Sequence, residues 1–500
     1  MNLCALIKGI AYSHPEKLAL IDSEEEITYW ELWQRIESLS NIFSSMGIKK
    51  NTRVVIILPN CKEFIFCFFA ILNLNAIAVP LKLNMTCWEL SRIFKNCRPK
   101  CLILTYDLIE KLLSKRPSLL KNKIVVVRED HSYRGILDTN GHLGKTVLYT
   151  FNKLYEMAEQ EGCKSTKISA CPKQIASINY TYRGYGYPLG AMLTHNNYIH
   201  GAIRYIKLVG IEENMRILLV LPLSHIFPLV GCIIVPLLAK ATIIILEGIN
   251  PKKIFHMIEK NKVNVLVCVP ALYEFLLKHY DNRKHNISSV QFGISGAELM
   301  SCDLNAKIKS ELGIEIIQGY GLTETLPVTC NPRWGNRPET IGITGHDVQI
   351  KIIDEQGREC KTGEIGEIAV KCPSVMTGYY REPEETSNVI KSDFFHTGDL
   401  GLIDSKNYVY FKGLKKSITK INGITVDLNE IKTILELNHK IHIDGIFIED
   451  IIINEKQKRK KGIIVRYSEK MKNSVSSSEI LKLLSKYLSE YKLPKEIIKS

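Results

Sequence analysis

The stretch from Asn51 to Leu81, "NTRVVIILPNCKEFIFCFFAILNLNAIAVPL", decides the class of fold. Its first part, "RVVIILP", is a short apolar run that predicts a buried strand, "CKEFIFCFFAILNLN" predicts a helix, and "AIAVPL" predicts a second strand. Repeated units of this kind imply mostly parallel sheets with helices on their faces. Ligands in such folds bind in crevices beyond the carboxyl ends of the strands. The sequence therefore predicts an α/β protein.

The division of the chain follows from where this pattern stops. Helix-like and strand-like segments alternate over roughly the first 410 residues. A less regular stretch at 118–170 is expected to decorate the first domain, and "REDHSYRGILDTNGHLGK" within it, at 128–145, is expected to be surface loop. Near Lys412 to Ser417 the composition shifts toward Lys and Ile. We therefore expect a large domain at 1–412, with mixed and parallel sheets flanked by helices, and a small α+β domain at 413–500. In the small domain, "SVSSSE" is expected to cap the helix "ILKLLSKYLSEY".

Composition narrows the function classes. The 500 residues are 45% apolar and 24% charged, as in ordinary globular proteins. The net charge of +14 comes from scattered lysines and not from one basic stripe, so a nucleic-acid partner is not expected. The densest basic run, Glu455 to Gly462, is expected to be a solvated hairpin loop, with contact to phosphate or lipid head groups as the alternative. Peripheral membrane contact thus stays open.

Cysteines and apolar runs bear on the compartment. The 14 cysteines show no metal-ligand spacing, and the N-terminus lacks a secretory signal, so reduced thiols in a cytoplasmic protein are expected. From Ile217 to Ala239 no charged residue occurs, which is long enough to span a bilayer. Three prolines and the pair Ser224 and His225 interrupt this run. A buried strand, a loop and a short buried helix are therefore favoured over a transmembrane helix.

A glycine-rich stretch, "NYTYRGYGYPLGAMLTHNN", runs from Asn179 to Asn197. Gly184, Gly186 and Gly190 can adopt positive φ and let backbone N–H groups approach an anion, as in phosphate-binding loops. The spacing does not match a dinucleotide fingerprint, and the lysine and hydroxyl of a Walker loop are missing. A tight glycine turn between two strands is the alternative explanation.

Two later motifs favour a nucleotide. "IQGYGLTETLP" places Tyr320, Thr323 and Glu324 close together, and these side chains can stack on a base, bind a phosphate oxygen and hold Mg²⁺. "FFHTGDLG" adds Asp399, whose carboxylate can accept hydrogen bonds from both hydroxyls of a ribose. Together the motifs predict a nucleotide and a metal ion.

The order of the motifs resembles that of the AMP-forming adenylating enzymes, the superfamily of acyl-CoA synthetases, acyl-carrier-protein ligases, luciferases and peptide-synthetase adenylation domains. The resemblance covers nearly all of the chain. It is carried by the opening stretch, by "LPLSHIFPLVG", "VCVPALYEFLL", "GISGAELM", "YGLTE" and "TGD", and by "GLKKSITKINGITVDLNEI". It implies an acyl-CoA synthetase-like fold with a mobile C-terminal domain.

The resemblance also implies a reaction in two halves. A carboxylic acid, fatty or otherwise apolar, attacks the α-phosphate of Mg·ATP to give an acyl-adenylate and pyrophosphate. The thiol of CoA or of an acyl carrier protein then takes the acyl group. ATP, Mg²⁺ and CoA or phosphopantetheine are therefore the implied cofactors and partners, and positioning with charge stabilisation is expected to dominate catalysis.

Residue roles follow from the matching motif positions. Tyr320 would stack on adenine, and Asp399 would bind the ribose. Thr323 would contact the α-phosphate, and Glu324 would be the metal ligand. His225 would lie beside the reacting carboxylate, or it is a histidine satisfied within an apolar segment. The other expected contacts are, at the adenine edge, Ser295, Gly296, Ala297, Glu298 and Gly321, at the phosphates, Thr181, Gly184, Gly186 and Gly190, and, against pantetheine, Gly423.

Several positions depart from the family's pattern. In the phosphate loop, three hydroxyl residues and the lysine of Y-T-S-G-T-T-G-x-P-K-G are replaced, and Arg183 is expected to restore one catalytic cation. Leu414 replaces an arginine, Ser417 stands at the hinge aspartate, and no residue matches the family's C-terminal lysine. Two alternatives therefore stay open: an impaired nucleotide- or acyl-binding paralogue that keeps the fold, and a protein that only transfers a preformed acyl-adenylate.

Overall fold

A computed structural model describes residues 2–128, 145–161, 171–182, 186–415, 418–421, 424–439, 442–452, 459–468 and 476–499. The opening stretch forms the predicted unit, since β3 and β4 pair in parallel with Val55 opposite Val79 and are joined by α3. These strands belong to a seven-stranded sheet in the order β7-β6-β5-β3-β4-β8-β9, parallel except for its last pair. Its strands are β3 (Arg53–Ile57), β4 (Ile77–Pro80), β5 (Cys101–Thr105), β6 (Ile124–Arg128), β7 (Val147–Thr150), β8 (Ile175–Tyr182) and β9 (Pro188–Thr194).

A second large sheet has nine strands in the order β16-β15-β14-β13-β12-β10-β11-β1-β2. The six strands in its middle are parallel, and antiparallel strands close both edges. Its strands are β1 (Leu18–Ile21), β2 (Glu26–Thr28), β10 (Arg216–Leu219), β11 (Thr242–Ile245), β12 (Val265–Cys268), β13 (Phe292–Ser295), β14 (Glu315–Leu322), β15 (Leu326–Cys330) and β16 (Ile343–Thr344).

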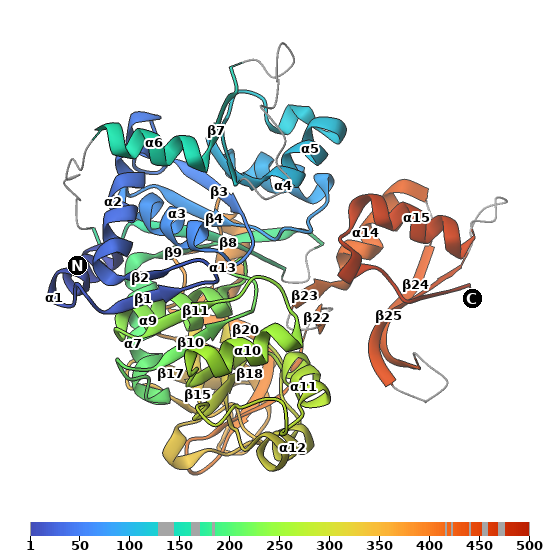
Figure 1. Cartoon of the computed structure of the whole chain (residues 1–500). Coiled ribbons are helices and arrows are strands. Elements are labelled where there is room, and N and C mark those ends of the chain that lie inside the picture. Colours follow the sequence, from blue (N-terminus) through green and yellow to red (C-terminus); the bar gives the residue numbers. More distant parts are fainter. Residues whose placement is uncertain are drawn as a thin grey trace.

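Helices cover both large sheets, as the strand–helix repeats predict (Figure 1). The helix α3 is almost wholly apolar and buries every residue from Phe64 to Asn73, because it lies in one apolar cluster with strands of both sheets. The helices of this part are α1 (Leu3–Ser13), α2 (Tyr29–Ser45), α3 (Lys62–Asn73), α4 (Cys87–Cys97), α5 (Tyr106–Lys115), α6 (Phe151–Glu161), α7 (His195–Val209), α8 (Ile226–Pro228), α9 (Val235–Leu238), α10 (Pro251–Asn261), α11 (Pro270–His279), α12 (Cys302–Leu312) and α13 (Pro383–Val389), with short helical turns η1 (Pro117–Leu119), η2 (Leu229–Ile234) and η3 (Arg333–Gly335).

A five-stranded sheet follows, made of β17 (Gln349–Ile353), β18 (Gly366–Lys371), β19 (Ile390–Lys391), β20 (Phe394–Ile403) and β21 (Val409–Leu414). The strands β20 and β21 pair antiparallel on either side of a turn at Ser405 to Asn407. Beyond them lies the C-terminal segment, by which we mean the described residues from Ile418 onward. It holds β22 (Ile418–Ile421), β23 (Ile424–Asp427), α14 (Leu428–His439), β24 (His442–Ile452), β25 (Arg459–Ser468), α15 (Ser477–Tyr487), η4 (Glu490–Lys492) and β26 (Glu496–Lys499).

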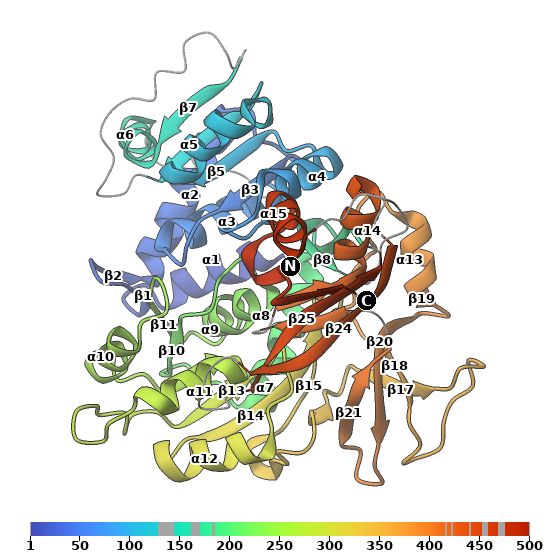
Figure 2. The ribbon, with the colours of Figure 1, turned by 90° about the vertical axis from the view of Figure 1, so that its right-hand side faces the viewer.

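The C-terminal segment docks beside the larger part of the chain, with β22 and β23 between the two (Figure 1). Figure 2 shows α15 near α4, and the hydroxyl of Thr86, which caps α4, donates to the carbonyl of Tyr487 at 2.9 Å. The expected helix cap at "SVSSSE" is confirmed, since Ser476 and Glu479 form a capping box. The large α/β part and the small α+β part agree with the predicted fold class, while the boundary between 412 and 413 stays a prediction.

The structure bears on several of these expectations. Within the less regular stretch at 118–170, β6 and β7 extend the seven-stranded sheet and α6 follows them. Most of the expected surface loop at 128–145 lies outside the described residues. The uncharged run from Ile217 to Ala239 forms β10, a loop, α8, η2 and α9, as favoured. In the described part of the chain, no helix is both long and apolar enough to cross a membrane. Half of the basic run, residues 459–462, belongs to β25 and pairs with β24, so this half is strand and not loop. The other half, 455–458, lies outside the described residues.

Candidate active site

A central cleft opens where the carboxyl ends of β8, β13 and β14 meet, as expected for an α/β fold. Side chains from widely separated segments form its wall. The lining residues are Thr181, Tyr182, Tyr205, His225, Ile226, Phe227, Val230, Gly296, Ala297, Gly319, Tyr320, Gly321, Leu322, Thr323, Glu324, Leu326, Pro327, Asp399 and Leu414.

The phenol of Tyr320 and the carboxylate of Asp399 meet in this cleft. The Tyr320 hydroxyl donates to Asp399 Oδ2 at 2.7 Å, although 79 residues separate them. Asp399 lies in β20 directly opposite Leu414 of β21, the position at which the family pattern has an arginine. An aromatic ring and a carboxylate at one wall of the cleft can hold a base and a ribose.

The turn between β14 and β15 presents Thr323 and Glu324. Gly321 permits this turn, because a Cβ atom there would lie 2.2 Å from the carbonyl oxygen of Leu326. Glu324 is buried, and its carboxylate accepts a hydrogen bond from the hydroxyl of Tyr379 at 2.7 Å. Across the described residues, no cluster of three or more histidine, cysteine or carboxylate side chains could hold a metal ion. A Mg²⁺ ion bound mainly by nucleotide phosphates needs only one or two protein carboxylates, and Glu324 is suitable.

The segment after β13 forms another wall. Gly296 packs against the ring of Phe227, since a Cβ atom there would meet ring carbons at 3.0 Å. Ala297 has a positive φ of 68°. Gly296 and Ala297 line the cleft, but Ser295, which is buried at the end of β13, and Glu298 are not among the lining residues.

His225 lies at the junction of the central cleft and a neighbouring cavity. Its Nδ1 accepts from the backbone N–H of Phe227 at 3.2 Å and caps α8. The ring therefore has a structural contact while it lines the cleft, so both expectations for this residue are compatible with the structure.

The glycine stretch forms a hairpin, not a loop that opens directly into a helix. The strands β8 and β9 pair antiparallel up to Tyr182 opposite Pro188. Gly186 has a φ of +78° in the connection. Gly190, however, lies within β9, where a Cβ atom would meet Ile178 at 2.6 Å, so close packing on β8 explains this glycine. Its assignment to the phosphate-binding residues stays a prediction. The expected residues Arg183, Gly184 and Gly423 lie outside the described residues.

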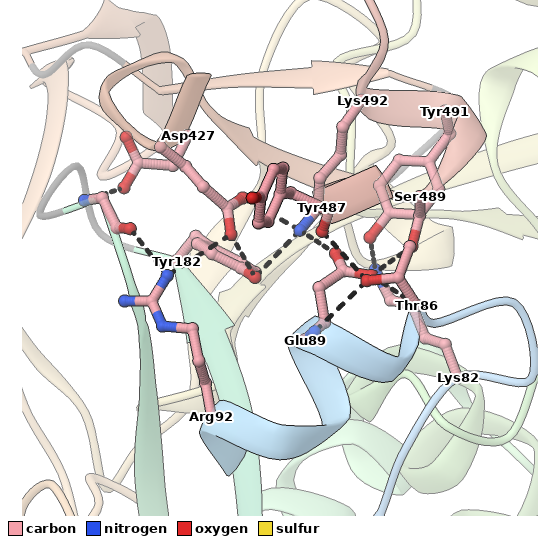
Figure 3. A network of polar contacts seen from close by, with 12 residues as sticks. Lys82, Thr86, Glu89, Arg92, Tyr182, Asp427, Tyr487, Ser489, Tyr491 and Lys492 are labelled. Atoms are coloured by element: carbon pink, nitrogen blue, oxygen red, sulfur yellow. Dashed lines mark hydrogen bonds and ion pairs between the residues drawn. The ribbon is translucent and has the colours of Figure 1, made fainter. Parts of the chain in front are cut away.

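A buried ion cluster, for which no sequence motif provides a signal, joins the hairpin to the C-terminal segment (Figure 3). Lys492 Nζ lies 2.5 Å from Glu89 Oε1, 2.9 Å from Glu430 Oε2 and 2.8 Å from the Tyr182 hydroxyl. Tyr182 in turn donates to Glu430 Oε1 at 3.0 Å. We call these four residues the lysine clamp. Because both carboxylates and the ammonium are 1% exposed, solvent screens them little.

Burial and neighbouring charges shift the pKa values of the clamp residues in opposite directions. Burial raises the pKa of Glu89, but the ammonium of Lys492 outweighs this and holds the pKa below its ordinary value. The pKa of Glu430 is raised, because burial there exceeds the effect of Lys492. Burial alone would lower the pKa of Lys492, yet the neighbouring Tyr182 and Glu430 hold it well above the usual range. Lys492 is therefore the charged centre of the clamp, and Glu430 is the carboxylate more readily protonated.

A second lysine lines the neighbouring cavity. Lys82 Nζ donates to the hydroxyl of Tyr491 at 3.0 Å. Burial, with repulsion from Lys492, lowers the pKa of Lys82 to about 7. Its side chain therefore changes charge near neutral pH.

The fold and the cleft define a nucleotide-binding enzyme with an acyl-CoA synthetase-like architecture. The chain belongs to the family described as "AMP-binding enzyme", whose pattern matches residues 8–380. This confirms the predicted family and the class of AMP-forming enzyme.

Similar proteins share the whole length of the chain. A long-chain-fatty-acid–CoA ligase of Bacillus subtilis (strain 168) is 26% identical over 460 residues, covering 87% of this chain and 80% of that protein. A crotonobetaine/carnitine–CoA ligase of Salmonella agona is 24% identical, covering 99% of this chain and 94% of that protein. The solved structure of a double mutant of o-succinylbenzoate CoA synthetase from Bacillus subtilis superposes with a TM-score of 0.81 at 20% identity, covering 99% of this chain and 94% of that chain. The fold class is thereby confirmed.

Proposed function

We propose that the protein is an AMP-forming acid–thiol ligase. It activates a carboxylic acid with ATP to an acyl-adenylate and transfers the acyl group to a thiol of CoA or of an acyl carrier protein. The observation that carries the proposal is the convergence of Tyr320, Thr323, Glu324 and Asp399 on one cleft, beside His225. The names of the similar CoA ligases support it and do not favour a non-catalytic paralogue.

The nucleoside is held by the cleft wall in this proposal. Adenine stacks on Tyr320, its edge faces the backbone of Gly296 and Ala297, and the ribose hydroxyls donate to Asp399. The hydrogen bond between Tyr320 and Asp399 fixes both groups before the ligand arrives, so little ordering remains to be done on binding.

Transfer at the α-phosphate depends on charge and position. The hydroxyl of Thr323 donates to an α-phosphate oxygen. Glu324 would hold Mg²⁺, which would neutralise charge that develops on the phosphates. An oxygen of the substrate carboxylate attacks phosphorus, and pyrophosphate leaves. The thiol then attacks the acyl carbonyl, and AMP leaves.

The acid is expected to be apolar. Ile226, Phe227, Val230 and Leu326 line the cleft, and the first three follow closely after His225 in the chain. Such a wall stabilises an alkyl or aromatic chain by about 25 cal/mol per Å² of apolar surface that it buries. Fatty acids are therefore the first substrates to test.

The test is acid-dependent release of pyrophosphate from Mg·ATP with a panel of fatty and aromatic acids, followed by transfer to CoA or to a carrier protein. Glu324→Ala is expected to lower release by roughly a hundredfold or more, since a charge contact to the transferring group is lost. The matched control is Glu159→Ala, an exposed glutamate on α6. ATP binding without pyrophosphate release for any acid would refute the proposal.

Arg183 provides a separate test of the altered phosphate loop. As the proposed substitute for the family's lysine, its change to alanine should weaken ATP binding and slow pyrophosphate release. Unchanged ATP affinity and rate in Arg183→Ala would show that it has no such role.

A further inference from the structure

One backbone amide of the glycine hairpin is already engaged by an anion from the C-terminal segment. The N–H of Gly186 donates to Oδ2 of Asp427 at 2.7 Å, across 241 residues of sequence. Asp427 ends β23 and is completely buried, and Gly186 is buried as well. The positive φ of Gly186 turns this amide as in an anion-binding nest.

A carboxylate oxygen and a phosphate oxygen make the same kind of hydrogen bond to such an amide. One N–H donates one strong bond, so Asp427 and a nucleotide phosphate compete for Gly186. The negative charge of Asp427 adds repulsion, which is large because the site is shielded from water. We take this hairpin, the counterpart of the family's phosphate loop, as the site of the terminal phosphates of ATP, and it disfavours them while Asp427 is in place.

The lysine clamp holds Asp427 in this position. Tyr182, the last residue of β8, lies beside the hairpin connection and is bonded to both Lys492 and Glu430 of the C-terminal segment (Figure 3). Arg92 of α4 contacts the same hairpin, since its Nη1 donates to the carbonyl oxygen of Gly186 at 3.3 Å and lies 4.0 Å from Glu430 Oε1. The hairpin is thus held both by the C-terminal segment and by α4.

The central cleft stays open in this docked arrangement. Tyr320, Asp399 and Gly296 line it, and Asp427 is not among its lining residues. The nucleoside part of a ligand can therefore bind where the terminal phosphates of ATP cannot.

We propose that Asp427 is a specificity determinant of the docked enzyme: the site then accepts an adenylate and rejects ATP and pyrophosphate. This inference rests on the proposed function. Its consequence concerns the second half of the reaction, in which the acyl-adenylate meets the thiol. Pyrophosphate that enters the hairpin could attack the α-phosphorus of the acyl-adenylate, re-forming ATP and releasing the acid. Asp427 blocks that reversal until the acyl group has been transferred.

The experiment compares Asp427→Ala with Asp303→Ala, an exposed aspartate on α12, in the full chain. Calorimetric titration with ATP and with AMP is the primary readout. We expect Asp427→Ala to bind ATP roughly tenfold more tightly, as for loss of one competing charged hydrogen bond, with AMP affinity unchanged. Pyrophosphate-dependent formation of ATP from the acyl-adenylate should rise by a similar factor.

Asp427→Asn keeps the size and an acceptor oxygen but removes the charge, and it should give a smaller change in the same direction. It also serves if the alanine variant does not fold. If Asp427→Asn and the parent bind ATP with equal affinity, the inference is overturned. The proposed function still stands in that case, as long as the parent binds ATP and releases pyrophosphate in the presence of the acid. A parallel rise in ATP and AMP affinities also overturns the inference. Absence of nucleotide binding in the parent chain would instead overturn the proposed function.

Discussion

Replacing Lys492 with methionine tests the charges that join the C-terminal segment to α4. The ammonium makes contacts of 2.5 to 2.9 Å with Glu89, Glu430 and Tyr182, all of them buried. Methionine keeps most of the volume but leaves two carboxylates without their buried cation. Because breaking a buried pair from one side costs about 3–5 kcal/mol, the docked state should be strongly destabilised at neutral pH.

The loss of stability in Lys492→Met, and its dependence on pH, are set by the proton that one of the two unpaired carboxylates takes up. Glu89 keeps hydrogen bonds from the hydroxyl of Ser489 and the backbone N–H of Thr86, both to Oε2. Glu430, whose pKa burial already raises, is therefore the group that takes up a proton in the variant. Protonating a glutamic acid with an ordinary pKa of about 4.3 costs about 3.5 kcal/mol at pH 7 and about 1 kcal/mol at pH 5.

The free energy of unfolding of Lys492→Met should rise as the pH falls from 7 to 5. Between these pH values the folded variant binds a proton that the unfolded chain does not bind, so a lower pH favours the folded state. The difference between the parent and Lys492→Met should therefore shrink from pH 7 to pH 5. If the C-terminal segment separates first, the carboxylates become hydrated, and the loss is limited to the free energy of docking.

The assay is hydrogen exchange of the α4 and α15 amides together with thermal melting at pH 7 and pH 5. Lys482→Met, at an exposed site on α15, is the matched control, and adding Glu430→Gln to Lys492→Met should recover most of the loss. The reasoning would be refuted if Lys492→Met resembled Lys482→Met at both pH values, or if its deficit grew as the pH fell.

Three further predictions test other parts of the structure. Arg204→Met should lower the free energy of unfolding by about 3–5 kcal/mol in denaturant titrations, because the buried guanidinium pairs with the carboxylate of Asp347 at 2.7 Å. A loss below about 1 kcal/mol would contradict this. Competitive acetylation across pH, read by mass spectrometry, should give Lys82 a half-reactivity near pH 7, and reactivity still rising above about pH 9 would count against it. Gly321→Ala should abolish pyrophosphate release and destabilise the turn, because its Cβ would meet the Leu326 carbonyl oxygen at 2.2 Å, whereas Gly9→Ala, with nothing within 4 Å, should leave activity intact.

Local patterns account for what could be predicted of the fold. The run from Asn51 to Leu81 specifies strand, helix and strand through the spacing of its own apolar residues, and capping boxes such as that of Thr194 with Asn197 mark helix starts within four residues. The strand β6 was not predicted in the same way, because irregular sequence follows its short apolar run, and periodicity alone cannot distinguish such a run from part of a buried helix.

Some features of the candidate site could also be predicted from local sequence, and others depend on the tertiary structure. Tyr320, Thr323, Glu324 and Asp399 lie in compact motifs, so the chemistry of their side chains and their order along the chain are enough to indicate a nucleotide site. The tertiary structure adds that they share one cleft and that Tyr320 binds Asp399 directly. It also places Gly190 in β9, which pairs with β8.

The sequence by itself determined the α/β class, the order of the motifs and the class of ligand, because each depends on residues close together along the chain. Only the tertiary structure decided that Lys492 would meet Glu89, 403 residues away, and that Asp427 would bind the amide of Gly186. A lysine in "YKLP" and a glutamate in "TCWEL" look like ordinary surface residues. Burial at the junction with the C-terminal segment makes their charges interact strongly, and burial depends on how distant parts of the chain pack.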